Sequence, residues 1–417
     1  MNHEIRPLTQ KEELAAYARI AFDAYPGFGM EDAAHLEAYL VKIAEKAGSV
    51  RPFGAFRHGN LTGGMLVYDY SMNYRGAFLP VGGVGLVAVD LLHKKEHVCK
   101  DLITSFILES RDRGRLLTLL YPFRPDFYYK LGYGYGSPIY EYRVRTENFT
   151  QGSTKEGLEH ASAEDREAMA RCYNQVAGMT HGMIKRSGSD MGRLLAKKGH
   201  HAVAVREKGD VTGYVIYKFE SVHKNNFVVN DLVIIERMET TPQSRERLNT
   251  FLGGQRDQCA YVTYRTFDAE EYHLLADPRD PSGDLVPEVY HSSHRGAVGL
   301  MYRIGDIEGF FREADFPAPQ DWETLALEVT DTLLEKEPLT GCLVQKEGRL
   351  HFLPRKDVKG IPMVRIGIQA LSSLVMGALS PGKALKDFLA SADSKEAENG
   401  LLRLCGVIEK PQCWTSF

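Results

Sequence analysis

An almost wholly apolar segment at residues 83–89 constrains the fold of this chain more than any other feature. A short apolar run of this length is typical of a buried strand, because core helices are usually longer. A polar stretch at 93–97 follows it, and apolar residues at helical spacing continue from 100 to 110. A buried strand, a polar turn and a helix in this order indicate a sheet with helices packed on it.

The segments around this strand predict a mixed α/β unit in the first 145 residues. Apolar residues recur at helical spacing in two early segments, and a His58-Gly59-Asn60 turn joins two strand-like segments. We predict helices at 10–24 and 32–46, hairpin strands at 54–56 and 63–70, a strand at 116–121, a helix at 127–131 and a strand in the glycine- and tyrosine-rich segment 132–136.

A second copy of this pattern follows about 150 residues later. The turn Asn60-Leu61-Thr62-Gly63 recurs as Asp210-Val211-Thr212-Gly213, and each turn starts a strand. A strand at 228–235, a helix at Pro242–Gly253 and a strand at 260–266 continue the parallel. We interpret this as a repeat of one fold, with chance similarity of two hairpins as the alternative.

The last 120 residues have a different pattern. A polar, proline-rich segment at 275–296 marks a boundary. Beyond it we predict strands at 298–304, 325–331, 341–346 and 349–353, helices at 307–314 and 381–390, and a buried strand-to-helix passage at 366–379. This order indicates a small α+β domain with an antiparallel sheet.

Composition excludes several classes of protein. Hydrophobic residues make up 43% of the 417 residues and charged residues 25%, which is typical of globular domains. Length alone suggests about three domains. The net charge of −4 argues against a general nucleic-acid binder, and no apolar run is long enough to span a membrane.

The N-terminus and the cysteines point to the cytoplasm. The start Met-Asn-His-Glu-Ile-Arg has neither the basic beginning nor the apolar core of a signal peptide. Six scattered cysteines form no CxxC pair, so we expect reduced thiols and no metal site.

Two segments are candidates for chemistry. The polar loop after residue 89 carries Lys94 and Lys95 and leads into a helix, whose free N–H groups favour phosphate or pyrophosphate. A solvated basic loop is the alternative. The aromatic segment from Phe127 to Gly134, Phe-Tyr-Tyr-Lys-Leu-Gly-Tyr-Gly, is either packing or an active-site helix.

Together and in this order, the two segments resemble the GNAT superfamily of N-acetyltransferases. The whole chain resembles the Eis family, through Val87-Ala88-Val89, His93-Lys94-Lys95, Phe127-Tyr128 before Leu131-Gly132-Tyr133-Gly134, and a final Phe417. The resemblance implies tandem GNAT folds, each a mixed central sheet with flanking helices, followed by a sterol-carrier-protein-like α+β domain. The implied domains are a catalytic GNAT domain at 1–147, a degenerate one at 148–290 and the C-terminal domain at 291–417.

The resemblance also implies roles for individual residues. Tyr128 matches the general acid, and the α-carboxylate of Phe417 matches the general base. Acetyl-CoA is the implied cosubstrate, with no metal. Its implied binding residues are Val87, Ala88, Val89, Lys94, Lys95, Glu96, His97, Val98, Cys99, Lys100, Phe123 and Arg124. For the amine we expect Asp23, Tyr25, Phe28, Leu86, Tyr121 and Ser416, although Asp23 can equally be a solvated helix residue and the aromatics core residues.

The loop departs from the superfamily pattern Arg/Gln-x-x-Gly-x-Gly/Ala. Here Lys94-Lys95-Glu96-His97-Val98-Cys99 lacks the glycine, so a Cβ at His97 would crowd a phosphate, and Glu96 adds negative charge. In the second copy, Glu236 and Glu239 occupy the corresponding region without a lysine pair. We therefore expect no coenzyme site there.

The leading hypothesis is an acetyl-CoA-dependent N-acetyltransferase acting on primary amines of polycationic small molecules such as aminoglycosides. Two alternatives remain: acetylation of polyamines or of lysines in proteins, and a lipid-binding protein with a relic acetyltransferase domain. The resemblance further implies a homo-oligomer, either a trimer or a hexamer.

Overall fold

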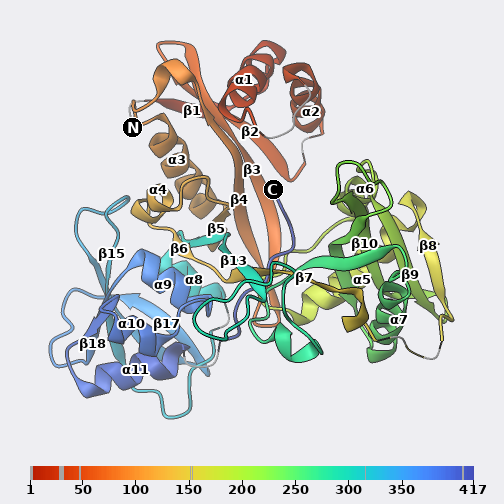
Figure 1. The fold of residues 1–417 in the computed structure, drawn as a ribbon. Coiled ribbons are helices and arrows are strands. Elements are labelled where there is room, and N and C mark those ends of the chain that lie inside the picture. The colour runs from red at the N-terminus through yellow and green to blue at the C-terminus, as the bar shows by residue number, and fades with distance from the viewer. Residues whose placement is uncertain are drawn as a thin grey trace. The chain divides into compact units, whose positions relative to one another are not determined.

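A computed structural model describes residues 3–27, 32–46, 48–150, 152, 154–314, 316–405 and 408–417. The chain divides into two compact units (Figure 1). The first unit combines Met1–Gly136 with Leu300–Phe417, and the second is Ser137–Gly299. No helix in the described ranges is long and apolar enough to cross a membrane.

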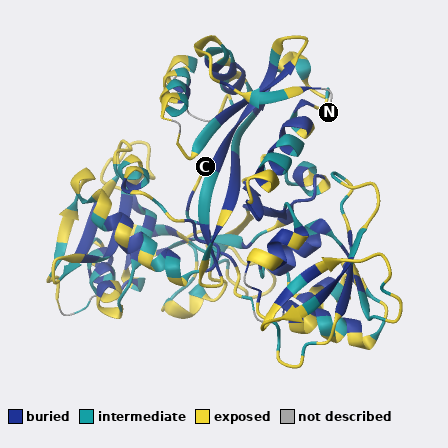
Figure 2. Ribbon diagram, turned by 180° about the vertical axis from the view of Figure 1, so that it is seen from behind, coloured by how far each residue is buried: buried dark blue, intermediate teal, exposed yellow. Residues whose placement is uncertain are grey.

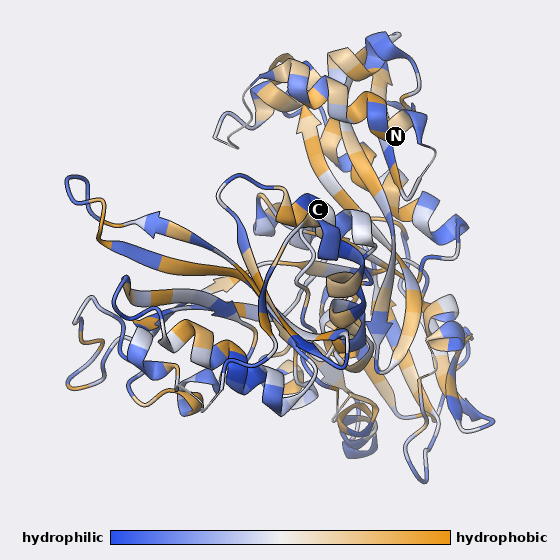
Figure 3. Cartoon of the chain, turned by 90° about the vertical axis from the view of Figure 1, so that its right-hand side faces the viewer, coloured by the Kyte–Doolittle hydropathy of each residue, from blue (hydrophilic) through white to orange (hydrophobic). Residues whose placement is uncertain are grey.

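The first unit is built on a mixed seven-stranded sheet of the described strands. Its order is β1-β2-β3-β4-β5-β14-β6. The strands are β1 Glu4–Pro7, β2 Val50–Arg57, β3 Asn60–Tyr74, β4 Ala77–Val89, β5 Leu117–Leu120, β6 Gly134–Tyr135 and β14 Met301–Ile304. Figure 3 shows apolar residues along most of the long strands of this unit, as expected for a sheet covered on both faces.

Helices cover both faces of this sheet (Figure 1). They are α1 Lys11–Ala24, α2 Ala33–Glu45, α3 Val98–Asp112 and α4 Pro125–Lys130, with a short 3₁₀ turn, η1, at Leu91–His93. One buried cluster joins α1 and α2 to the sheet, and a second joins α3 and α4 to it. Both clusters reach β4, which therefore lies in the middle of the core (Figure 2).

The C-terminal part of the first unit has its own five-stranded sheet, in the order β17-β16-β15-β18-β19. Its strands are β15 Leu325–Thr330, β16 Leu339–Lys346, β17 Arg349–Pro354, β18 Met363–Gly367 and β19 Ala390–Ala392. Its helices are α8 Ile307–Glu313, α9 Ile368–Val375, α10 Pro381–Lys386 and α11 Lys395–Cys405. The helix predicted at 381–390 is shorter than expected, because the chain turns at Phe388, which has a positive φ, and then forms β19.

The second unit repeats the topology of the first sheet. Its order is β8-β9-β10-β11-β12-β7-β13. The strands are β7 Pro138–Arg145, β8 Leu158–Ala161, β9 His201–Glu207, β10 Asp210–Ser221, β11 Asn230–Glu239, β12 Cys259–Thr266 and β13 His294–Val298. The helices are α5 Arg166–Met179, α6 Gly188–Leu195 and α7 Pro242–Gly253, with 3₁₀ turns at Thr146–Asn148, Ala163–Asp165 and Glu271–Leu274. The predicted helix at Pro242–Gly253 is confirmed at both ends.

The single strand predicted at 298–304 is wrong. The structure has two strands there, separated at Gly299 and Leu300. β13 pairs with β7 in the second sheet, whereas β14 pairs with β5 and β6 in the first. The segment therefore leaves one sheet and enters the other within two residues.

Candidate active site

The candidate site is built around a β-bulge in β4. Gly64 of β3 faces Ala88, but Leu66 faces Gly85, so Leu86 and Val87 share a single partner position. Leu86 has a φ of 47°, and a bulge of this kind leaves one residue outside the ladder. The Tyr17 hydroxyl donates to the carbonyl of Leu86 at 2.6 Å, and the Tyr25 hydroxyl donates to that of Val87 at 2.8 Å.

The bulge lies where β4 and β5 separate. The two strands pair in parallel at only four positions, ending with Val84 and Leu120. β4 continues to Val89, while the chain after β5 turns toward α4. The edge of Gly85 to Val89 on the β5 side is therefore not paired with β5. We call this place, where the two strands separate, the opening.

The N-terminus of α3 lies eight residues beyond the end of β4. Its N-cap, His97, adopts a left-handed conformation (φ 65°) and makes no side-chain cap, so the first N–H groups of the helix receive no bond from it. Lys95 is also left-handed (φ 67°). The loop thus keeps the backbone conformation that glycine favours, although it contains no glycine.

The carboxylate of Glu96 has two partners, Arg57 at the end of β2 and His93 in the loop. Its carboxylate accepts from Arg57 at 2.8 Å and lies 3.0 Å from Nδ1 of His93. The hydrogen bond to His93 is the main reason that the pKa of Glu96 is lowered. Lys94 and Lys95 are exposed, so the loop still offers net positive charge.

Tyr128 projects from α4 into the core beneath the bulge. Its ring makes edge contacts with Phe127 and Tyr133, at centroid distances of 5.3 and 6.2 Å. Its hydroxyl shares a side-chain hydrogen bond with Cys99, in the first turn of α3. Burial raises the pKa of Tyr128 well above 10.0 and that of Cys99 to about 11, so both groups are protonated at neutral pH.

The last residue, Phe417, packs against the other side of the same strand. Its ring lies 5.5 Å from Tyr68 and 5.2 Å from both Tyr70 and Tyr121. The Tyr121 hydroxyl donates to the carbonyl of Thr415 at 3.0 Å, which fixes the approach of the tail. A Cβ built on Gly85 would lie 2.9 Å from the carboxyl carbon of Phe417, so this carboxyl group rests directly on β4 beside the bulge.

The structure brings most of the predicted residues to this opening. Val87, Val89 and Cys99 are half-buried against one cluster, whereas Ala88 is buried in the other, which Leu86 and Phe417 also join. Val98 is buried at the start of α3, and Lys100 is exposed one turn into it.

Two predicted coenzyme contacts, Phe123 and Arg124, are exposed. Phe123 is 75% exposed, and its ring makes an edge contact with Tyr25 at 6.0 Å. Arg124 is exposed and forms an ion pair with Asp126 at 2.6 Å. Both therefore lie at the surface beside the opening rather than within it.

The predicted amine-binding residues divide into two groups. Tyr25, Leu86 and Tyr121 line the bulge and the tail, as described above. Asp23 is exposed in the last turn of α1, and Ser416 is exposed beside Phe417. Phe28 lies outside the described residues.

Sequence reasoning missed Tyr17, Tyr68 and Tyr70, which hold the bulge and the tail. The sequence held a signal for Tyr68 and Tyr70, because residues two apart on a strand lie on the same face. In the structure their rings stack at a centroid distance of 5.5 Å. Tyr17 gave no such signal, since its position is typical of a core aromatic on a helix.

The second unit has a related bulge but a different interior. The register of β10 and β11 skips Ile235, next to Glu236. Glu236 is buried and bonds Arg186 at 2.6 Å and the Tyr214 hydroxyl at 2.7 Å. A buried ion pair therefore lies beside this second bulge, where the first unit has Phe417 and an opening.

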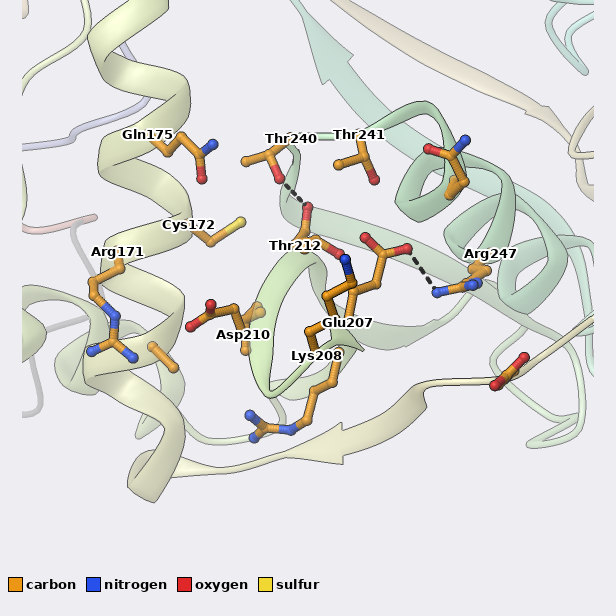
Figure 4. Close-up of a pocket in the computed structure, with 15 residues that line it drawn as sticks. Arg171, Cys172, Gln175, Glu207, Lys208, Asp210, Thr212, Thr240, Thr241 and Arg247 are labelled. Atoms are coloured by element: carbon orange, nitrogen blue, oxygen red, sulfur yellow. Dashed lines mark hydrogen bonds and ion pairs between the residues drawn. The ribbon is translucent and has the colours of Figure 1, made fainter.

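A cavity of about 860 Å³ in the second unit lies at the N-terminus of α7 (Figure 4). Only Thr240 and Thr241 separate β11 from α7, against eight residues between β4 and α3. Thr241 caps the helix, accepting from the Ser244 N–H at 3.0 Å, and Arg247 pairs with Glu207 at 2.9 Å. Thr241 and Arg247 are thus engaged within the protein, whereas Arg171 and Lys208 also line this cavity. That this copy holds no coenzyme stays a prediction.

Among the described residues, no group of three or more metal-ligating side chains comes together.

Comparison with known families identifies both repeats. An acetyltransferase (GNAT) domain family matches residues 4–136, and a second family of the same description matches residues 182–304. The chain belongs to the GNAT acetyltransferases. It is an acetyl-CoA-dependent N-acetyltransferase with two GNAT domains in tandem.

Solved structures of similar fold span the whole of this GNAT protein. A GCN5-related N-acetyltransferase from Anabaena variabilis is 19% identical, with a TM-score of 0.79, and covers 99% of this chain and 100% of its own. Eis1 from Mycobacterium abscessus is 18% identical, with a TM-score of 0.76 and complete coverage of both chains. The Eis-like fold predicted from the motifs is confirmed. No curated protein matches the sequence.

Proposed function

We propose that the first GNAT domain transfers the acetyl group of acetyl-CoA to a primary amine of a polycationic small molecule, aminoglycosides included. One observation carries this proposal: the carboxyl group of Phe417 lies against Gly85, beside the bulge at Leu86 and Val87. A carboxylate held at that point faces the unpaired backbone of β4, on which an acyl group is positioned in this superfamily.

The residues of the opening fit acetyl-CoA. The backbone of Val87 and Val89, which is not paired with β5, suits an extended amide chain, and the N–H groups at the start of α3 suit a pyrophosphate. Lys94 and Lys95 add positive charge beside the helix terminus. Phe123, exposed next to Tyr25, offers an apolar contact.

Two groups carry out the proton transfers: the α-carboxylate of Phe417 and the phenol of Tyr128. The Phe417 carboxylate draws the ammonium group in and takes its proton, directly or through water. A backbone N–H near Val87 stabilises the developing oxyanion. Tyr128 then protonates the departing thiolate, and its raised pKa keeps the phenol protonated until that step.

The residues around Phe417, where we expect the amine to bind, favour a cation. Tyr68, Tyr70 and Tyr121 surround Phe417 with aromatic rings, and a carboxylate among aromatic faces suits an ammonium group. The choice of aminoglycosides comes from the Eis resemblance alone. Polyamines and peptide lysines present the same ammonium group.

A coenzyme-release assay tests the proposal. Purified protein is given acetyl-CoA and a panel of aminoglycosides, linear polyamines and lysine peptides, and free thiol is measured. We expect turnover with at least one aminoglycoside, and we expect Tyr128→Phe to lower kcat far more than KM. Turnover with lysine peptides alone would transfer the proposal to protein acetylation, and no turnover with any amine would refute it.

The lipid-carrier alternative receives less support from the C-terminal part. The passage at 366–379 is confirmed as β18 followed by α9, and α9 is buried along most of its length. Its apolar residues therefore serve the core of this part.

Two broader proposals accompany the function. We propose a homo-oligomer, a trimer or a hexamer, on the resemblance alone. We also propose a cytoplasmic location, which the absence of disulfides among the six cysteines supports.

A further inference from the structure

Arg303 is a buried charge that the proposed reaction does not use. It lies on β14, and its side chain is 0% exposed. Its Nη2 group donates to Asp331 at the end of β15. Within the part of the chain that the structure describes, its Nε and Nη1 groups have no hydrogen-bond partner. A buried guanidinium with a single carboxylate partner is costly, which calls for an explanation beyond stability.

The free edge of this guanidinium contacts the turn that ends α4. Gly132 has a φ of 88°, and a Cβ built on it would overlap Nη1 of Arg303. The same turn anchors the proposed acid, because the carbonyl of Tyr128 accepts from the N–H groups of Leu131 at 2.9 Å and of Tyr133 at 3.1 Å. Arg303 therefore packs against the backbone that fixes Tyr128.

Asp331 connects this contact to the core around Tyr128. Its second carboxylate oxygen accepts from the Leu333 N–H at 3.1 Å. Leu333 and Leu334 pack against the cluster that contains Tyr128. Movement of the Arg303–Asp331 pair would therefore disturb both the turn after Tyr128 and the side chains packed around it.

Two further bonds from α9 hold the same helix and the strand after it. The Gln369 side chain donates to the carbonyl of Tyr129 at 3.1 Å, and the Ser373 hydroxyl donates to that of Tyr135 at 2.8 Å. The chain from residue 300 onward thus contacts α4 both at its end and along its backbone.

We propose that Arg303 and Asp331 are positioning residues that set the orientation of Tyr128. This inference rests on the proposed function, in which Tyr128 is the acid. The pair acts through the Gly132 turn and touches neither substrate.

Asp331→Asn is the first test. The amide has a single acceptor oxygen, so it can accept from Arg303 or from the Leu333 N–H but not from both, and it removes the charge. Because misplacement of a reacting group by about 1 Å can cost about a hundredfold in rate, we expect kcat to fall about 10-fold to 100-fold. KM for acetyl-CoA and for the amine should stay within about threefold, since neither binding surface changes.

The buried pair of the second unit provides a matched control. Arg186 and Glu236 are buried to a similar degree and bond at 2.6 Å. Arg303→Met with Asp331→Leu, and Arg186→Met with Glu236→Leu, each replace a buried pair by apolar side chains, which proteins often tolerate. We expect only the first double variant to lower kcat, while thermal unfolding shows both to be folded.

Combination with Tyr128→Phe separates this inference from the proposed function. If the pair acts through the phenol, Asp331→Asn should cause no further loss in a Tyr128→Phe background. An independent loss there, a kcat for Asp331→Asn within twofold of wild type, or an equal loss in the control pair would overturn the inference. Full activity of Tyr128→Phe alone would instead refute the acid assignment itself.

Discussion

At the scale of single residues, the burial of Tyr128 determines the expected pH dependence. Burial raises the pKa of this phenol above its ordinary value of 10.0, so its acid form persists to higher pH. The amine substrate must lose a proton, and a lysine-like amine has a pKa of about 10.4. We therefore expect kcat/KM to rise with pH up to about 10, without a descending limb below it. A pH–rate profile from 6 to about 10 measures this.

The profile has a clear contrary outcome. A descending limb in the wild-type protein between about pH 7 and 9 would mean that the acid loses its proton early, and Tyr128 would then not be that acid. Inactivation by unfolding is excluded by returning each sample to pH 8 and measuring its activity again.

Gly85 offers a second test at this scale. A methyl group there would meet the carboxyl carbon of Phe417 at 2.9 Å, its oxygen at 3.1 Å and Tyr68 at 3.3 Å. Gly85→Ala should therefore displace the carboxyl group and lower kcat by about tenfold or more, with little effect on coenzyme binding. Gly382→Ala is the matched control, because nothing lies within 4 Å of a Cβ there. Equal kcat values for the two variants would contradict the placement of Phe417.

At the scale of elements, the loop between β4 and α3 carries the coenzyme prediction. The compensation of Glu96 by Arg57 and His93 leaves Lys94 and Lys95 as the exposed charges. Lys94→Ala with Lys95→Ala should raise KM for acetyl-CoA several-fold and leave kcat near the wild-type value. The effect should shrink at high salt, because exposed charges are screened. A KM that does not change at low salt would place the pyrophosphate elsewhere.

Local patterns made many of these elements predictable. The helix at Pro242–Gly253 has Thr241 as a cap and proline in its first turn, which mark its start, and glycines at 253 and 254, which mark its end. The apolar run at 83–89 is the second half of β4, whose first half at 77–82 was not predicted. The first strand, β1, was also missed, because four residues carry too little pattern.

Long-range pairing could not be predicted. Nothing in 298–304 shows that Val298 ends a strand of one sheet and Met301 begins a strand of another, because pairing depends on which edge is left open after folding. The bulge at Leu86 and Val87 could likewise not be predicted from the sequence, because it arises from a register shift between β3 and β4. The phenols of Tyr17 and Tyr25 that hold it come from a helix about 60 to 70 residues earlier.

At the scale of the whole molecule, two copies of one topology differ in what occupies the bulge. In the first unit the bulge faces an opening and the carboxyl group of Phe417. In the second, Glu236 is engaged with Arg186 and Tyr214, and a two-residue loop replaces the eight-residue one. A single coenzyme per chain is therefore the expected stoichiometry, and calorimetric titration with coenzyme A measures it. Two equivalent sites would contradict this account of the second unit.

The C-terminal segment completes the first unit in three places. It supplies β14 to the sheet, the Arg303–Asp331 pair behind α4, and Phe417 beside β4. Catalysis in the first GNAT domain is thus expected to depend on residues about 170 to 290 positions away from Tyr128.

Addition of one alanine after Phe417 tests this account most directly. The extension moves the negative charge by one residue and places a peptide group where the carboxylate rests on Gly85. Gly382→Ala, where nothing lies within 4 Å of the added Cβ, again serves as the control. We predict that the extended protein keeps its thermal unfolding temperature and binds coenzyme A, but loses at least about a hundredfold in kcat. Wild-type turnover by the extended protein would show that the carboxyl group of Phe417 takes no part in the reaction.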